Sequence, residues 1–259
     1  MLSAVKSVVK RALRKGASFS YPKKCTVCGN KVKAFVPLPE YYVLSAKKYG
    51  FPYSADQGET LNYKEYSCPL CSASDRDRLY ALYLQRHIDP RKQYKLLDIA
   101  PAITLRKYLK KKENVSYRSA DLFSEDVDDT GVDITDMKIY ENGSFDIFIC
   151  SHVLEHVVDD RKAMRELKRV LKSDGFGIAM VPIVMGLEKI DEDPTVTDVA
   201  ERWRRFGQDD HLRLYTKAAF TERLKESGFR VTELTVKEFG EDVFFKHGIS
   251  PTSVLYIVN

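Results

Sequence analysis

The sequence predicts an α/β fold in which a mostly parallel sheet, covered by helices on both faces, follows a small cysteine-rich lobe. Three observations predict it. Two C-x-x-C pairs lie in the first third of the chain, and strand-like and helix-like segments alternate from residue 74 onward. The composition, 44% hydrophobic and 31% charged, is that of a folded globular protein. No apolar run approaches the ~20 residues that a membrane span requires.

The basic residues are concentrated at the N-terminus. Nine of the 42 Lys and Arg residues lie in residues 1–39, which contain no acid, so the remainder of the chain has a net negative charge. This charge distribution disfavours a large nucleic-acid surface. Within residues 1–20 the apolar and basic positions alternate at helical spacing, which predicts a basic amphipathic helix. That helix either packs on the protein or lies on an anionic membrane surface.

The four cysteines of the two C-x-x-C pairs are Cys25, Cys28, Cys68 and Cys71. Each pair places two thiolates on one side of a metal, and two pairs complete the tetrahedral Cys₄ shell that Zn²⁺ prefers. The alternative is disulfides or free thiols. The basic residues near the N-terminus interrupt any export signal, so we expect a cytoplasmic location, where disulfides are disfavoured. We therefore predict a structural zinc site in a lobe spanning residues 21–73.

The remaining segments follow from hydrophobic periodicity and turn residues. In the lobe we predict strands at 31–36 and 61–66 and a helix at 40–48. Residues 74–259 form the main domain, with a lid around 186–215. Its predicted helices span 74–89, 105–112, 160–172, 195–207 and 216–227, and its strands span 94–99, 115–120, 145–151, 177–183, 229–236 and 253–258.

Carboxylates follow two of the predicted strands. In open α/β sheets, ligands bind beyond the carboxyl ends of the strands. The first strand ends in Asp98 and the run 100–102, the second ends at Asp121, where a carboxylate can accept both hydroxyls of a ribose, and Asp133 follows an acidic loop. The dinucleotide fingerprint G-x-G-x-x-G and a Walker lysine motif are both absent from the sequence.

The segment after the fourth strand carries a family resemblance. The run FDIFICSHVLEH at 145–156, the helix 159–172 with Gly175, and the segments 192–194 and 206–213 resemble class I S-adenosylmethionine-dependent methyltransferases of the type 11 group. Bacterial methyltransferases with an N-terminal Cys₄ lobe, many of them linked to surface-polysaccharide assembly, are similar across nearly the whole chain after residue 24. The chain departs from the general class at 100–102, where most members have a glycine-rich turn.

The resemblance implies a seven-stranded Rossmann-like sheet, S-adenosylmethionine as cofactor and a set of contact residues. Asp98, Ala100, Pro101 and Ala102 would border the methionine end, Asp121 and Leu122 the ribose and adenine, Asp133 and Ile134 the adenine, and Ser151 and His152 the sulfonium. The acceptor is expected to be a saccharide hydroxyl, free or on a glycolipid at the inner face of the membrane. The alternatives are an RNA methyltransferase, with RNA held by the lobe, and a cofactor-free scaffold.

A hydroxyl is a poor nucleophile and gains from a general base near neutral pKa, which favours histidine. We predict His211 as the base and Asp210 as its orienting partner, with His152 also in the catalytic site; the alternative is a structural His–Asp pair that holds the lid. The acidic stretch 188–193 predicts either a solvated loop or a divalent-metal site. Cys150 lies in an apolar strand and is expected to be a core residue.

Overall fold

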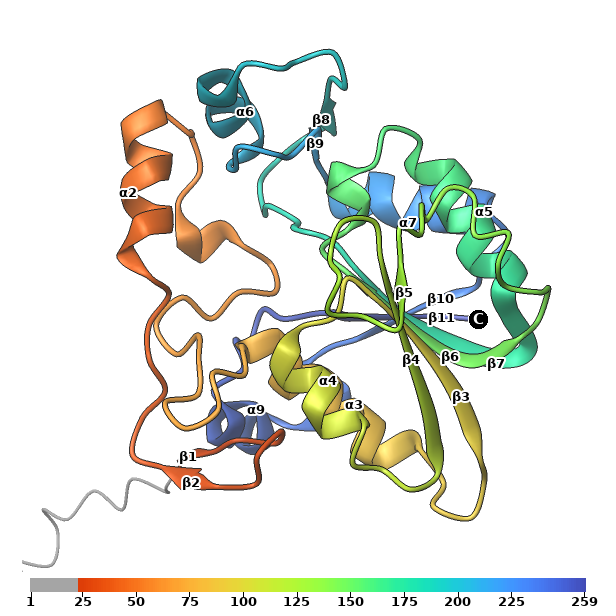
Figure 1. The fold of residues 1–259 in the computed structure, drawn as a ribbon. Coiled ribbons are helices and arrows are strands. Elements are labelled where there is room, and N and C mark those ends of the chain that lie inside the picture. The colour runs from red at the N-terminus through yellow and green to blue at the C-terminus, as the bar shows by residue number, and fades with distance from the viewer. Residues whose placement is uncertain (1–22) are drawn as a thin grey trace, which may run out of the picture.

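The computed structural model describes residues 23–259, so the helix predicted at 1–20 lies outside the described residues. Its centre is a seven-stranded sheet in the order β10-β11-β7-β6-β3-β4-β5 (Figure 1). The strands from β5 to β7 are parallel, whereas β11 and β10 pair antiparallel at one edge. The bounds are β3 Tyr94–Ile99, β4 Val115–Asp121, β5 Asp129–Thr130, β6 Phe145–Ser151, β7 Leu171–Met180, β10 Val231–Leu234 and β11 Leu255–Val258.

The central strands are buried on both faces because helices cover both sides of the sheet. Leu96, Leu97, Ile147 and Phe148 are fully buried, as near-continuous apolar strands of a parallel sheet require. Figure 1 shows α3 and α4 on one side of the sheet and α5 and α7 on the other. The helices are α3 Asp75–His87, α4 Ile103–Leu109, α5 Asp160–Val170, α7 Lys217–Glu226, α8 Val236–Phe239 and α9 Glu241–His247, and η2 Leu154–His156 is a 3₁₀ turn.

The N-terminal lobe contains β1 Lys23–Lys24, β2 Lys31–Val32, α2 Glu40–Tyr49 and η1 Ala55–Gln57. One arginine of α3 attaches it to the main domain. The fully buried Arg78 guanidinium donates to the carbonyls of Glu65 and Ala73 in the lobe, at 2.6 and 2.9 Å, and to those of His247 and Gly248 after α9, at 2.7 and 2.9 Å. Because these carbonyls belong to both parts of the chain, Arg78 fixes the lobe to the sheet domain.

A cap formed by β8 Asp191–Glu192, α6 Val199–Phe206 and β9 Arg213–Leu214 follows β7. It packs against α2 of the lobe, as Figure 1 shows for the orange α2 and the teal α6. Trp203 of α6 stacks on Tyr49 with ring centroids 5.9 Å apart and meets Tyr41 edge-on at 6.1 Å. The lobe and the cap therefore form one continuous structure beside the sheet.

The predicted strand at 61–66 is wrong, because this segment has no regular structure and the carbonyls of Glu65 and Tyr66 accept from Arg78 instead. The helix predicted at 160–172 ends at Val170, and β7 begins at once with Leu171. The short β5, α8 and α9 were not predicted. Among the described residues no helix combines the length and apolarity of a membrane span.

Candidate active site

The strand order places a switch point between β3 and β6. From β3 the chain adds β4 and β5 on one side, then returns to add β6 and β7 on the other. The crevice at such a reversal, beyond the carboxyl ends of the strands, is where ligands bind in open α/β sheets. The two segments that meet there are residues 98–102 after β3 and 151–156 after β6.

The segment after β3 makes a tight turn without glycine. Ala100 has φ of 48°, in the left-handed region, and its amide donates to the Ala120 carbonyl at 2.8 Å. The preceding Asp98 is buried and accepts from the Tyr117 hydroxyl at 2.8 Å. Burial raises the pKa of Asp98 to about 7. The turn thus keeps the backbone geometry that glycine would favour, with small side chains in its place.

The segment after β4 combines a carboxylate with exposed apolar side chains. One oxygen of Asp121 accepts the amides of Phe123 and Ser124, at 2.7 and 2.8 Å, which leaves the other without a donor among the described residues. Leu122 is 46% exposed and Phe123 is 86% exposed. Farther along, Asp133 accepts from the Thr135 amide at 2.7 Å and Ile134 is buried.

The segment after β6 also turns through the left-handed region, because His152 has φ of 57°. The Ser151 hydroxyl lies 2.8 Å from the Tyr80 hydroxyl. His152 Nε2 contacts the Arg76 guanidinium, which can only donate, so this nitrogen is the acceptor and Nδ1 carries the proton. Burial, followed by the positive charge of Arg76, lowers the pKa of His152 to about 4.

Glu155 is the centre of a cluster that includes three histidines. Its carboxylate is completely buried, and neither oxygen has a hydrogen-bond partner among residues 23–259. His152 Nδ1 lies 3.3 Å and His156 Nε2 lies 3.9 Å from Glu155 Oε1. Burial opposes the charged form, but the imidazoles of His152, His211 and His156 outweigh it and lower the pKa of Glu155 to about 2. The Nδ1–H of His152 is therefore the nearest donor to this carboxylate, and among the described residues no donor reaches it in good hydrogen-bond geometry.

His211 reaches this cluster from the cap, between α6 and β9. Its ring is buried and meets the His156 ring edge-on, with centroids 4.8 Å apart. Its Nδ1 donates to the Phe206 carbonyl at 3.2 Å, and burial lowers its pKa, so the ring is neutral. The carboxylate of Asp210 contacts Nδ1 of His156, at 3.4 Å, so the sequence-predicted partner of His211 orients the neighbouring histidine.

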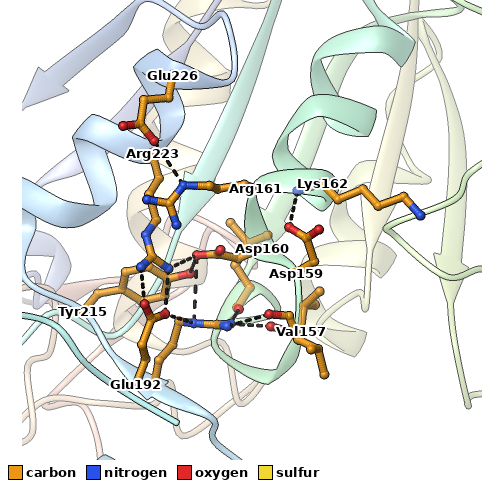
Figure 2. A network of polar contacts seen from close by, with 12 residues as sticks. Val157, Asp159, Asp160, Arg161, Lys162, Glu192, Tyr215, Arg223 and Glu226 are labelled. Carbon is orange, nitrogen blue, oxygen red and sulfur yellow. Dashed lines mark hydrogen bonds and ion pairs between the residues drawn. The ribbon is translucent and has the colours of Figure 1, made fainter. Parts of the chain in front are cut away.

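A buried ionic network fixes the backbone of this cluster (Figure 2). Arg213 of β9 donates to the carbonyls of Leu154, Val157 and Val158, which flank Glu155 in η2, and pairs with Glu192 at 3.2 Å. Arg223 of α7 binds Glu192 at 2.6 Å. It also binds Asp160 at 2.6 Å, and Asp160 accepts from Tyr215 as well. The backbone around Glu155 and the cap are thus held to each other.

The acidic stretch 188–193 is engaged in this and a neighbouring set of ion pairs. Arg205 binds Asp191 at 2.5 Å and Asp193 at 3.1 Å, and Glu192 belongs to the network above. These three carboxylates therefore hold the cap in place through arginines. Close by, a cavity of about 160 Å³ lies between Pro52 and Tyr53 of the lobe and Arg204 and Arg205 of the cap.

The four predicted cysteine ligands converge in the lobe. Cys25 and Cys71 have their sulfurs 3.7 Å apart, Cys28 and Cys68 theirs 4.0 Å apart, and all four lie within 4.8 Å of one another. A tetrahedron of sulfurs at the usual zinc distance has edges of about 3.8 Å. Each knuckle turns through a left-handed residue after its second cysteine, Gly29 with φ of 76° and Ser72 with φ of 63°. Cys150 is buried in β6, as predicted for a core residue.

Residues 78–179, which span α3 to β7, match the family model described as a methyltransferase domain. Together with the sheet order and the antiparallel β11, this match identifies the fold class. The fold is that of a Rossmann-like class I methyltransferase. It agrees with the prediction of a seven-stranded, mostly parallel sheet. No curated protein matches the chain.

Solved structures give distant similarities over most of the chain. A SAM-dependent methyltransferase from Archaeoglobus fulgidus is 15% identical, covers 73% of this chain and 94% of its own, and has a TM-score of 0.45. The YcgJ protein from Bacillus subtilis is 20% identical, covers 66% of this chain and 77% of its own, and has a TM-score of 0.41.

Two of the residues in the buried cluster, Glu155 and His156, were not among the predicted site residues. The sequence signal that could have found them is the run 151–156, in which His152 and His156 flank a carboxylate directly after the strand. Their convergence with His211 depends on the cap folding back over η2, where the amide of Leu212 donates to the Glu155 carbonyl at 2.9 Å. No local spacing encodes that contact.

Proposed function

We propose that the chain is an S-adenosylmethionine-dependent methyltransferase that methylates a hydroxyl group of a saccharide. The observation that carries the proposal is the buried cluster of His152, Glu155, His156 and His211 at the switch point of a methyltransferase fold. Methyl transfer from a sulfonium is an in-line displacement, in which positioning contributes most of the rate enhancement. A neutral hydroxyl acceptor adds the need for a group that takes its proton.

The residues after β3 and β4 fit the cofactor. The left-handed turn at Ala100, followed by Pro101 and Ala102, leaves small side chains where the methionine end would lie. Asp121 offers an oxygen to the ribose hydroxyls, and exposed Leu122 offers an apolar surface to adenine. Asp98, Asp133 and Ile134 border the same edge. When bound, the cofactor supplies an electrophilic methyl group.

In this proposal His211 accepts the proton of the acceptor hydroxyl. Its Nδ1 donates to Phe206, so its Nε2 carries the lone pair. His152 and Ser151, at the carboxyl end of β6, border the position of the sulfonium, and Arg76 fixes the His152 ring. Asp210 orients His156 beside the base. Glu155 and His211 are buried and shielded from bulk water, whereas the side chains of His152 and His156 are 24% and 32% exposed.

For the lobe we infer a structural zinc ion held by Cys25, Cys28, Cys68 and Cys71. The sulfur separations fit a tetrahedral shell, and four thiolates leave no open position for catalysis. The cavity beside Tyr53, between the lobe and the cap, suits a sugar ring. In this proposal the enzyme acts in the cytoplasm on a free saccharide or on a glycolipid at the inner face of the membrane.

Calorimetry with S-adenosylhomocysteine on zinc-replete protein tests the cofactor assignment. We expect one ligand per chain at micromolar affinity or better. Absence of binding by folded protein would favour the scaffold alternative instead. With binding established, transfer of labelled methyl groups to saccharide and RNA acceptors separates the two enzyme alternatives, because binding of RNA would weaken steeply with salt. His211→Ala is expected to bind S-adenosylhomocysteine normally and to lose turnover about 10²-fold or more.

A further inference from the structure

The cluster after β6 has the composition of a metal site distinct from the cysteine site. One ligand atom each from Glu155, His156 and His211 lies within 4.8 Å of the others. Ligands at about 2.0–2.2 Å from a common metal ion lie about 3–4.4 Å apart, so small side-chain movements bring these three to bonding distance. Among the described residues, the four cysteines are the only other group with this property.

The Glu155 carboxylate supplies the second, independent observation. It is 0% exposed, and in the part of the chain that the structure describes neither of its oxygens has a partner in hydrogen-bond geometry. A buried ion without compensation is costly, because the interior replaces none of the hydration that it has lost. His152 offsets part of this cost from 3.3 Å, outside hydrogen-bond geometry. A cation between Glu155 and the two remaining histidines would satisfy both oxygens.

The two histidines are already oriented as metal ligands. Histidines that bind metals nearly always donate their other ring nitrogen to a carboxylate or a backbone carbonyl. His156 directs Nδ1 to Asp210 at 3.4 Å, which leaves Nε2 facing Glu155 Oε1 at 3.9 Å. His211 directs Nδ1 to the Phe206 carbonyl at 3.2 Å, which leaves its Nε2 free. The Nε2 lone pairs of His156 and His211 are therefore both available beside the buried Glu155 carboxylate.

We propose that Glu155, His156 and His211 bind a divalent transition-metal ion at the acceptor side of the site. Two imidazoles and one carboxylate suit Zn²⁺, Fe²⁺ or Mn²⁺ better than Mg²⁺ or Ca²⁺, which prefer oxygen ligands. Three protein ligands leave a coordination position open, in contrast to the closed Cys₄ shell. The network around Arg213 holds the backbone on both sides of Glu155, as a preorganised site requires.

This inference rests on the proposed function only for the role of the ion. As a Lewis acid it would lower the pKa of a hydroxyl at the open position, and His211 would then be a ligand and not the base. The hydroxyl releases its proton to water, its oxygen forms the new bond to the methyl carbon, and the carbon–sulfur bond breaks. The electron pair of that bond remains on sulfur, which leaves neutral S-adenosylhomocysteine.

The test is titration with Mn²⁺, followed by electron paramagnetic resonance, of full-length protein without a histidine tag and with zinc in the cysteine site. Thiolates bind Mn²⁺ poorly, so the probe reports on the second site. We expect one Mn²⁺ per chain, displaced by a second equivalent of Zn²⁺. Glu155→Gln keeps the side-chain volume and removes the charge, and should weaken Mn²⁺ binding at least tenfold. His87→Ala, at an exposed histidine of α3, is the control and should leave the titration unchanged.

His156→Gln provides a second ligand variant at a half-exposed position, where loss of folding is not expected. It should also weaken Mn²⁺ binding. Stoichiometric binding that survives both substitutions, or no binding by the wild-type chain, would overturn the proposal. The metal titration is independent of the cofactor. Binding of Mn²⁺ without binding of S-adenosylhomocysteine would support the metal site and reject the methyltransferase function. Binding of S-adenosylhomocysteine without binding of Mn²⁺ would support the methyltransferase function and reject the metal site.

Discussion

The two segments that meet at the switch point, after β3 and after β6, have the same backbone turn and different surroundings. Each places a residue other than glycine in the left-handed region, Ala100 with φ of 48° and His152 with φ of 57°. The β3 turn is built from small side chains and opens toward exposed Leu122. The β6 turn is packed with charged groups: the His152 ring contacts Arg76 and Glu155.

The difference in surroundings suggests different roles: the turn after β3 suits binding, and the turn after β6 suits chemistry. A turn of small residues lets a ligand approach the backbone, which suits a cofactor held by shape and by hydrogen bonds. A turn with a buried, unpartnered carboxylate stores electrostatic free energy that a proton or a cation can release. The same strand-end geometry thus supports the cofactor on one side and the activation of the acceptor on the other.

Removal of the proposed zinc ion is expected to have the largest effect and to disturb both turns. The lobe contacts the β3 side through Thr104, which donates to the Cys71 carbonyl at 2.9 Å, and the β6 side through Tyr66, which lies 3.2 Å from Arg76. Structural zinc contributes about 10 kcal/mol or more to such lobes, so the melting temperature should fall by more than about 10 °C. Circular dichroism melts with and without a chelator, with metal analysis, measure it. An unchanged melt of zinc-free protein would contradict the assignment.

The contrast between the cysteine and histidine clusters shows how much of a site can be predicted from the sequence. Two C-x-x-C pairs determine their own local geometry, and the small residues Gly29 and Ser72 after them adopt left-handed turns. The histidine cluster depends on a contact between residues 54 apart, His156 and Asp210, that only the folded cap creates. Local spacing predicts a knuckle, but it cannot predict which loop covers a strand end.

The secondary structure shows the same division. The long amphipathic helices and the buried strands β3, β4 and β6 were predicted because periodicity and burial agree there. The segment 61–66 has the composition of a strand, yet the carbonyls of Glu65 and Tyr66 accept hydrogen bonds from the buried Arg78 of α3. The two-residue β5 and the short helices α8 and α9 carry too little periodicity to be recognised, and they form because the rest of the fold is in place.

Arg213→Met is expected to destabilise the β6 side selectively. The buried guanidinium pairs with Glu192 and holds three carbonyls around η2, and its loss leaves these groups without their donor. Breaking a buried pair of this kind costs about 3–5 kcal/mol. Arg161→Met, which removes an exposed pair with Glu226 at 3.1 Å, is the matched control and should cost less than about 1 kcal/mol. Urea unfolding compares the two.

The affinity of Arg213→Met for S-adenosylhomocysteine tests whether the β3 and β6 sides act separately. Because Arg213 holds the segment after β6 and the cap, we expect its variant, measured well below its melting temperature, to keep cofactor affinity within about threefold while losing turnover. A large loss of affinity together with turnover would mean that the two strand ends are coupled, so that the cofactor and acceptor sides are not separable.

Asp98→Asn should remove the pH dependence of stability that the β3 side confers. Burial raises the pKa of Asp98 to about 7 from an ordinary value of 3.8, so the folded state holds this proton more tightly than the unfolded chain does. The wild type therefore loses stability as pH rises from about 4 to 7, and the loss is constant above that window. The upper bound is about 4 kcal/mol. The variant should be more stable than the wild type at pH 8 and equal to it near pH 4, measured by unfolding without cofactor. Equal stability at pH 8 would show that Asp98 is ionised at no cost.

The smallest expected effect on stability comes from glycine substitutions at Ala100 and His152, which compare the two left-handed turns directly. Glycine relieves the left-handed strain but adds backbone entropy to the unfolded chain, so Ala100→Gly should stabilise the protein by about 0.5–1 kcal/mol. His152→Gly gains the same relief but loses the contacts with Arg76 and Glu155, and it should be destabilised by about 1–3 kcal/mol. Opposite signs in urea unfolding would show that only the β6 turn depends on its side chain. If both variants gain stability, the charged contacts of His152 contribute nothing to folding, and its ring is held there for chemistry alone.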